Sequence, residues 1–482
     1  MENNYTVTMP NDGAQPPGKV RELTWKQLRQ VDHTFTDAFI LQLANDERLQ
    51  ATQIARILPK KRLVIFGTWQ DKPIVAKLFF HAKHAKRDME REMAGVRILQ
   101  ENSIPTPQLY QQTISHDQHV YILIFEQILA ADVLDIAHLD KQDDSRLKMI
   151  TEELATQHVL GIIQHDLHLK NFLLTEKKIY TLDGAQIEKA PYLLPKKISM
   201  QYLALFFAQL GVGMKEQQIA LFHYYARLRG WRLKKQDVLE LFLLIKKVNE
   251  ARWLSFAKKI FRNCTDFARI SHWKIVGMYH RISVSPQLFA AFKNPETLFN
   301  HPTATKLKTG RSTTVVKVTL DQRDYVIKRY NLKTSFHYLR RCLRPTRAAH
   351  CWRLAQKMNL FGLITAKPVA FIEKRYFGLR GVSYYITEYV QGEQADRFLA
   401  HADEVQTTQA IQHVSRVLKN LPQINITHGD LKITNILINQ QLQPVLIDLD
   451  GAAEHFSLSS LRGTWHKEIK RFLRNFHDNP TL

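Results

Sequence analysis

The chain has 482 residues, of which 45% are hydrophobic and 23% are charged, and its formal net charge is +23 at pH 7. This length is too great for one ordinary hydrophobic core and predicts two domains, while the apolar fraction is that of a folded globular protein. With only three cysteines, a disulfide framework is excluded, no disulfide partners are expected, and a reducing compartment fits.

Residues 1–20 are polar and contain three prolines, which predicts a loose tail. They lack a basic segment followed by an apolar run, so we expect no secretory signal. The most apolar stretches, such as Val120–Ile128 and Leu241–Ile245, are too short to span a bilayer. A cytoplasmic location is therefore expected.

The first half of the chain contains an ordered series of informative segments. A short apolar run ends in Lys77, and the following stretch has helical spacing that places Glu92 on a helix. A second apolar run, expected to be a strand, ends near Glu126. The motif HDLHLKN at 165–171 comes next, and another apolar run then leads to LDGA at 182–185. Helix-like patterning continues over 198–281 and predicts a helical lobe.

The second half repeats this series in the same order. Apolar runs end at Lys328 and near Glu388, HGDLKITN spans 428–435, and IDLDGA spans 447–452. The spacing from aspartate to asparagine is five residues in both halves (171 − 166 and 435 − 430). Recurrence of four elements in one order indicates an internal repeat. We expect a first module over 21–285 and a second over 286–482.

These residue types suit phosphoryl transfer, which depends on positioning and on neutralising phosphate charge. A strand lysine can neutralise phosphates, a loop aspartate can accept the proton of the attacking hydroxyl, and oxygen ligands can hold Mg²⁺. The candidates are Lys77 and Lys328 for the phosphates, Asp166 and Asp430 as bases, and Asn171, Asp183, Asn435 and Asp448 for the metal.

This order of residues resembles the protein-kinase fold. The resemblance implies an α+β chain of two tandem bilobal modules, each with a small antiparallel-sheet lobe and a helical lobe, that uses ATP and Mg²⁺. Lys432 matches the lysine that touches the γ-phosphate in protein and sugar kinases, whereas His168 resembles the aminoglycoside and choline phosphotransferases. Glu92, Glu126 and Glu388 are further candidate cofactor contacts, with Glu92 expected to pair with Lys77.

Two features of the kinase pattern are altered. There is no GxGxxG, and Ile65–Thr68 and Thr309–Val316 each fit either a shortened phosphate-covering hairpin or an ordinary turn. No arginine precedes either candidate base, which argues against a switch driven by activation-loop phosphorylation.

The second module is expected to be compact, because only 34 residues follow Asp448 (482 − 448). They include the basic, amphipathic segment Leu461–Arg474. Such an ending resembles the lipopolysaccharide kinases that act on core heptose and 3-deoxy-D-manno-octulosonic acid. The resemblance implies transfer of the γ-phosphate of ATP to a core-sugar hydroxyl at the inner-membrane face.

The charge is concentrated in residues 325–372, which contain no aspartate or glutamate and ten of the chain's lysines and arginines. A basic surface of this kind favours anionic partners. We expect lipopolysaccharide core or another anionic glycolipid and an anionic membrane surface, rather than nucleic acid. A solvated basic helix without a partner is the alternative.

Three questions stay open at this point. Matching the two LDGA segments makes Asp183 equivalent to Asp450 and puts Thr181 at the metal position, whereas counting twelve residues from Asn171 (183 − 171) favours Asp183 as the ligand. In the second module, Cys351 stands where the first has Glu92. The alternative functions are a small-molecule phosphotransferase and a non-catalytic pseudokinase scaffold.

Overall fold

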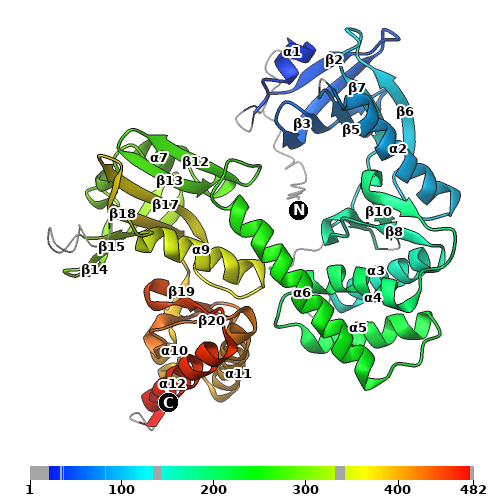
Figure 1. The fold of residues 1–482 in the computed structure, drawn as a ribbon. Helices are drawn as coiled ribbons and strands as arrows, with labels where there is room; N and C mark the ends of the chain where they lie inside the picture. The colour runs from blue at the N-terminus through cyan, green and yellow to red at the C-terminus, as the bar shows by residue number, and fades with distance from the viewer. Residues whose placement is uncertain are drawn as a thin grey trace. The chain divides into compact units, whose positions relative to one another are not determined.

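The computed structural model describes residues 21–32, 35, 37–81, 83–133, 143–176, 178–331 and 342–477. Two compact units divide them: unit 1 takes those up to 209 with 216–249, and unit 2 takes 210–215 with those from 250 onward (Figure 1). The expected tail over 1–20 and three cations of the basic segment, Lys333, Arg340 and Arg341, lie outside the described residues.

Unit 1 contains a seven-stranded sheet in the order β1-β2-β3-β4-β5-β7-β6, antiparallel except where β1 pairs with β2. The strands are β1 Arg21–Glu22, β2 Phe39–Gln42, β3 Arg48–Leu58, β4 Arg62–Trp69, β5 Lys72–Phe79, β6 Leu109–Ile114 and β7 Tyr121–Glu126. Helix α2, Ala85–Glu101, packs its apolar side on this sheet through Met89, Met93 and Val96. The short helix α1 spans Trp25–Leu28.

The rest of unit 1 consists of helices and two small antiparallel strand pairs. The helices are α3 Asp143–Val159, α4 Lys196–Phe207, α5 Lys215–Leu228 and α6 Lys235–Lys259, the last of which continues into unit 2. The strand pairs are β8 Ile162–Gln164 with β11 Ile187–Lys189, and β9 Phe172–Leu174 with β10 Ile179–Thr181. The 3-10 turn Leu169–Asn171 immediately precedes β9, and the 3-10 turn Gly184–Gln186 immediately precedes β11.

Unit 2 contains a second seven-stranded sheet, which begins earlier in the chain than the expected module boundary at 285. Its order is β12-β13-β17-β18-β16-β15-β14. The strands are β12 Phe267–His272, β13 Ile275–His280, β14 Thr305–Thr309, β15 Thr313–Leu320, β16 Arg323–Tyr330, β17 Pro368–Tyr376 and β18 Leu379–Glu388. The helical stretch expected over 198–281 therefore ends with α6. The remaining residues include the strands β12 and β13, and β13 pairs with β17 in the sheet.

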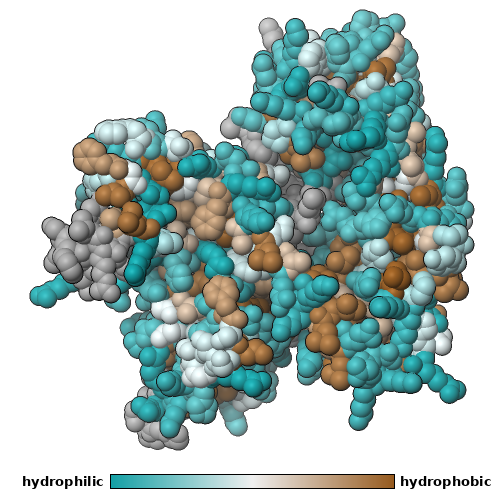
Figure 2. Space-filling view, viewed as in Figure 1, coloured by the Kyte–Doolittle hydropathy of each residue, from teal (hydrophilic) through white to brown (hydrophobic). Residues whose placement is uncertain are grey.

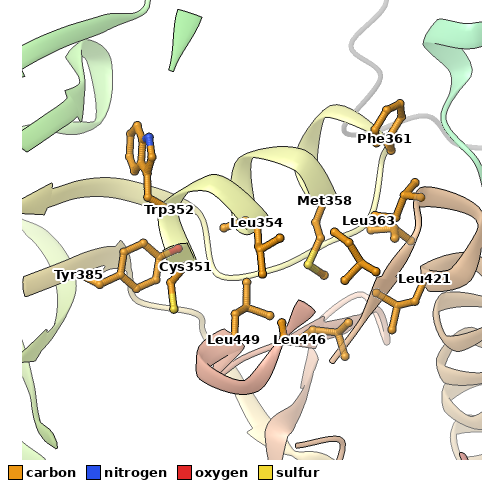
Figure 3. Close-up of a cluster of buried hydrophobic side chains, with 14 of the residues drawn as sticks. Cys351, Trp352, Leu354, Met358, Phe361, Leu363, Tyr385, Leu421, Leu446 and Leu449 are labelled. Carbon is orange, nitrogen blue, oxygen red and sulfur yellow. The ribbon is translucent and has the colours of Figure 1, made fainter. Parts of the chain in front are cut away.

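Four described helices of unit 2 contribute to one large hydrophobic core: α9 Arg347–Leu360, α10 Ala395–His401, α11 Glu404–Asn420 and α12 Leu458–His477. The short helix α7, Pro286–Ala291, instead packs on the sheet through Leu288. Figure 3 shows Leu354 and Met358 of α9 pointing toward Leu446 and Leu449. The short strands are β19 Gly392–Gln394, β20 Ile426–Thr427, β21 Ile436–Asn439, β22 Pro444–Leu446 and β23 Ala453–Glu454. The described chain is thus a mixed α+β protein.

Among the described residues, no helix combines the length and the apolar character that crossing a membrane requires.

Candidate active sites

In unit 2, Lys328 of β16 faces two aspartates from the turn after β22. Its Nζ lies 2.6 Å from Oδ1 of Asp448 and 2.8 Å from Oδ2 of Asp450. Burial lowers the pKa of Lys328, but Asp450 and Asp448 outweigh it and raise that pKa above its usual value. Burial in turn raises the pKa of Asp448, yet Lys328 holds it below the usual range. Lys328 and Asp448 are therefore both charged at neutral pH.

The loop that carries Asp430 has side-chain contacts within it and is joined to this turn by a backbone hydrogen bond. Nδ2 of Asn435 donates to the main-chain oxygen of Asp430 at 2.8 Å, and Nζ of Lys432 lies 3.1 Å from the carboxylate of Asp430. The backbone N–H of Ile447, next to Asp448, donates to the carbonyl of Asn435 at 3.0 Å. Sequence reasoning named four of these residues, and the fold brings them together.

Helix α12 supports the same loop from behind. Oε2 of the buried Glu468 accepts from the backbone N–H of His428 at 3.0 Å, and Arg471 donates to the carbonyl of Gly429 at 2.8 Å. Sequence reasoning found the basic amphipathic helix but missed both bonds, because only the fold shows which loop the helix meets.

Gly429 explains why no arginine precedes Asp430. Its φ is +76°, and a Cβ there would lie 1.9 Å from the carbonyl oxygen of Gly451. Only glycine fits such a conformation at such a close approach. The missing arginine is thus a steric requirement of this loop. In unit 1 the corresponding residue, His165, instead contacts Glu188 at 2.9 Å.

In unit 1, Lys77 of β5 contacts one acid from a helix and one from a turn. Its Nζ lies 2.5 Å from Oε1 of Glu92 on α2 and 2.8 Å from Oδ1 of Asp183. Burial raises the pKa of Asp183, but Lys77 and then Arg62 outweigh it and hold that pKa well below its usual range. The expected pairing of Lys77 with Glu92 is present.

Thr181 lies in a different environment. It is fully buried, its hydroxyl accepts from Nε2 of Gln157 at 2.9 Å, and its backbone N–H donates to the carbonyl of Pro105 at 2.8 Å. Thr181 therefore belongs to the interior of unit 1, whereas Asp183 faces Lys77.

Asp183 corresponds in place to Asp448. Each has a left-handed backbone, with φ of 60° and 59°, and each begins a 3-10 turn. The preceding residue, Leu182 or Ile447, donates its N–H to the carbonyl of the loop asparagine in its own unit. The equivalence of Asp183 with Asp450, expected from the matching LDGA letters, is therefore wrong by two residues, and the count from Asn171 gave the correct register.

The loop of unit 1 makes the same asparagine hydrogen bond, but it has His168 where the loop of unit 2 has Lys432. Nδ2 of Asn171 donates to the main-chain oxygen of Asp166 at 2.8 Å. Nδ1 of His168 accepts from the backbone N–H of Lys170 at 3.1 Å, so the ring caps its own turn. Gln209 accepts from the N–H of Leu169 and donates to the carbonyl of Leu167, and thereby holds the loop from behind.

A cavity of about 380 Å³ opens beside Lys77 and Asp183. Its walls are mostly apolar and include Val64, Val75, Phe125, Leu173 and Leu182, while Glu126 lies on its lining at the end of β7. A pocket of this size with apolar walls and a few charged groups at one end suits a small-molecule ligand. In unit 2 the corresponding strand-end acid, Glu388, contacts Lys367 at 2.9 Å.

The acid-free segment is less available to partners than its sequence indicates. Arg329 contacts Glu296 at 2.6 Å, the buried Lys357 contacts Glu454 at 2.6 Å, and Arg353 also pairs with Glu454. Several of its cations are thus neutralised by acids from other segments. On the face drawn in Figure 2, hydrophilic side chains predominate and hydrophobic ones form scattered patches.

A strand lysine facing a turn aspartate, beside a loop with an aspartate and an asparagine five residues apart, is an arrangement that suits a kinase-type phosphotransferase. The family comparison agrees with this class. Residues 303–480 match the model of the lipopolysaccharide kinase (Kdo/WaaP) family, and this match indicates that the protein is a phosphotransferase. The resemblance expected from the sequence is confirmed there. No curated protein matches the chain.

Proposed function

We propose that unit 2 transfers the γ-phosphate of ATP to a hydroxyl of a lipopolysaccharide core sugar. The observation that carries this proposal is the ion pair between Lys328 and Asp448 beside the Asp430–Asn435 loop, in the part of the chain that matches the kinase family. The family supplies the use of ATP and the class of acceptor. The particular sugar and the inner-membrane location of the reaction are part of the proposal.

Each residue has a role that its position permits. Asp430 accepts the proton of the acceptor hydroxyl, Lys328 neutralises the non-transferred phosphates, and Lys432 meets the transferred one. Because Nδ2 of Asn435 is used in its bond to Asp430, the amide oxygen is the atom that can serve as a ligand. That oxygen and the Asp448 carboxylate are hard donors that fit Mg²⁺. A bound Mg²⁺ would neutralise phosphate charge.

Unit 1 is a second kinase-like module in this proposal, and its cavity is a second nucleotide site. The support is the pairing of Lys77 with both Glu92 and Asp183 at one end of a 380 Å³ apolar cavity. In this module Asp183 and Asn171 would hold the metal and Asp166 would be the base, while Glu126 is a candidate nucleotide contact on the cavity lining.

The glycolipid acceptor would be reached at an anionic membrane surface on the cytoplasmic side. Support comes from α12, whose buried residues include Leu461 and Phe472. Its exposed cations are Arg462, Lys467, Lys470, Arg471 and Arg474. A helix with such an exposed basic face favours anionic headgroups.

Phosphate analysis of core oligosaccharide, from cells with and without the gene, tests the function directly. We expect one phosphate to be lost without the gene and to be restored by the wild-type chain but not by Asp430→Asn. An unchanged phosphate content would overturn the proposal. If transfer instead occurs to aminoglycosides or choline in vitro, a small-molecule phosphotransferase is favoured, and nucleotide binding without any transfer would favour a pseudokinase scaffold.

A further inference from the structure

The two units differ reciprocally at two positions around the strand lysine. The first position lies on the helix that follows it. In α2 the carbonyl of Leu99 accepts from Ile104, and in α9 the carbonyl of Met358 accepts from Leu363, both at 2.9 Å. These helix ends correspond, so the residues seven positions earlier also correspond (99 − 92 and 358 − 351). Glu92 of unit 1 thus has Cys351 as its counterpart.

The second position lies in the turn. Because Asp183 corresponds to Asp448, the residues two positions later are also counterparts, and these are Ala185 in unit 1 and Asp450 in unit 2. Unit 1 therefore has an acid on the helix and alanine on the turn, whereas unit 2 has cysteine on the helix and an acid on the turn.

We propose that Asp450 takes the place of the missing helix glutamate and is the positioning residue that holds Lys328 for its nucleotide. This inference rests on the proposed function of unit 2 and specifies which carboxylate orients its lysine. Asp450 reaches Lys328 Nζ at 2.8 Å from the turn after β22. The second carboxylate that contacts the lysine comes from the helix in unit 1 and from the turn in unit 2.

The surroundings of Asp450 fit a fixed ion-pair partner. Its Oδ1 accepts from the hydroxyl of Tyr330 at 2.5 Å and from Sγ of Cys351 at 3.4 Å. Burial and then Asp450 raise the pKa of Cys351, so the thiol stays neutral and acts as a donor. Cys351 is almost fully buried on α9 beside Tyr385 (Figure 3). Two donors from the helix and strand therefore hold the carboxylate toward Lys328.

This arrangement separates two tasks that one carboxylate cannot perform together. A lysine paired only with Asp448 would compete with a metal for that group. With Asp450 present, Lys328 keeps a partner when Asp448 turns to the metal. Unit 1 achieves the same separation with Glu92 and Asp183.

The test uses the full chain and site-resolved labelling by azido-ATP with Mg²⁺, in which labelled peptides from unit 1 serve as an internal control. For Asp450→Asn we expect the half-saturating nucleotide concentration of unit 2 to rise about 10- to 100-fold, as for a lost charged hydrogen bond. The Mg²⁺ concentration needed at saturating nucleotide should not change. Asp448→Asn should show the opposite pattern, with a raised Mg²⁺ requirement.

The second part of the test moves the carboxylate from the turn back to the helix. Cys351→Glu added to Asp450→Asn should recover most of the lost affinity, whereas the matched Cys351→Gln addition should not. Unchanged labelling by Asp450→Asn, or an increased Mg²⁺ requirement like that of Asp448→Asn, would overturn the inference. If the double variants do not fold, the inference is decided by the single variants alone. Asp450→Asn must then raise the half-saturating nucleotide concentration without raising the Mg²⁺ requirement. A wild-type unit 2 that takes no label at all would instead refute the proposed function.

Discussion

The side-chain amide of Asn435 donates to the main-chain oxygen of Asp430 at 2.8 Å, and its counterpart Asn171 makes the same bond to Asp166 at the same distance. The candidate base and the candidate metal ligand of each unit are therefore held by one hydrogen bond across a five-residue loop. A change at the asparagine must disturb the aspartate as well, so clean tests of the base require substitutions at the aspartate itself.

Asp430→Asn should abolish transfer by unit 2 and leave the chain folded. The substitution keeps the shape of a side chain that is partly exposed and removes the proton acceptor. Loss of a positioned base costs about 100- to 10,000-fold in rate. Radiolabel transfer from γ-labelled ATP to core oligosaccharide measures this, with circular dichroism as the folding control. Near-normal turnover would show that Asp430 is not the base or that unit 1 performs the transfer.

In unit 1, Asp183→Ala should abolish Mg²⁺-dependent nucleotide binding, whereas Thr181→Ala should leave it in place. The reason is that Asp183 faces Lys77 while the Thr181 hydroxyl bonds to Gln157 in the interior. Labelling by azido-ATP, mapped to peptides of unit 1, reports the binding.

Thr181→Ala should act on stability instead. It leaves the buried amide of Gln157 short of one acceptor, which costs about 1–3 kcal/mol, and a urea melt would measure this. Intact binding in Asp183→Ala, or none in the wild type, would mean that unit 2 holds the only active centre.

Helix α12 should control the rate through the loop that it supports. Glu468→Leu removes the acceptor for the buried N–H of His428, and an unmatched buried donor costs about 1–3 kcal/mol. Glu468→Gln keeps an acceptor oxygen and is the matched control. We expect a lowered unfolding free energy and reduced transfer for the leucine variant and a smaller effect for glutamine. Equal effects of both variants would show that the negative charge, rather than the hydrogen bond, matters.

Binding to anionic vesicles should weaken sharply as salt rises, because exposed charges are screened. Each lysine or arginine near an anionic surface contributes about 1 kcal/mol. The triple variant Lys467→Gln, Lys470→Gln, Arg474→Gln on the exposed side of α12 should therefore lose most of the binding. Lys357→Gln is not a suitable control, since Lys357 is buried against Glu454. Vesicle co-sedimentation in which pelleting does not depend on salt would contradict membrane attachment.

Much of the unit 2 site could be predicted from the order of residues along the chain, because lysine, aspartate and asparagine recur at fixed spacing. The register of the turn could not be read from identical letters. The link from Asn171 to Asp183 is one residue shorter than that from Asn435 to Asp448 (12 against 13). Matching LDGA therefore paired residues in different places, and backbone conformation was needed to resolve it.

The sequence also could not show which cations of 325–372 are paired with acids from distant segments. Composition marked 325–372 as a basic surface, yet Lys357 and Arg353 pair with Glu454, which lies about a hundred residues later (454 − 357 = 97). The strands β12 and β13 were missed because their apolar residues also fit a helical pattern, and only pairing with β17 distinguishes the two.

The left-handed backbone at Asp183 and Asp448 affects what would result from selecting variants of this protein for thermal stability. A residue with a side chain in that conformation costs about 1–3 kcal/mol, whereas glycine adopts it freely. Lys328 would keep Asp450 as a partner if Asp448 were replaced. Libraries screened only for heat resistance would therefore enrich glycine at 448, and their most durable members would be catalytically silent.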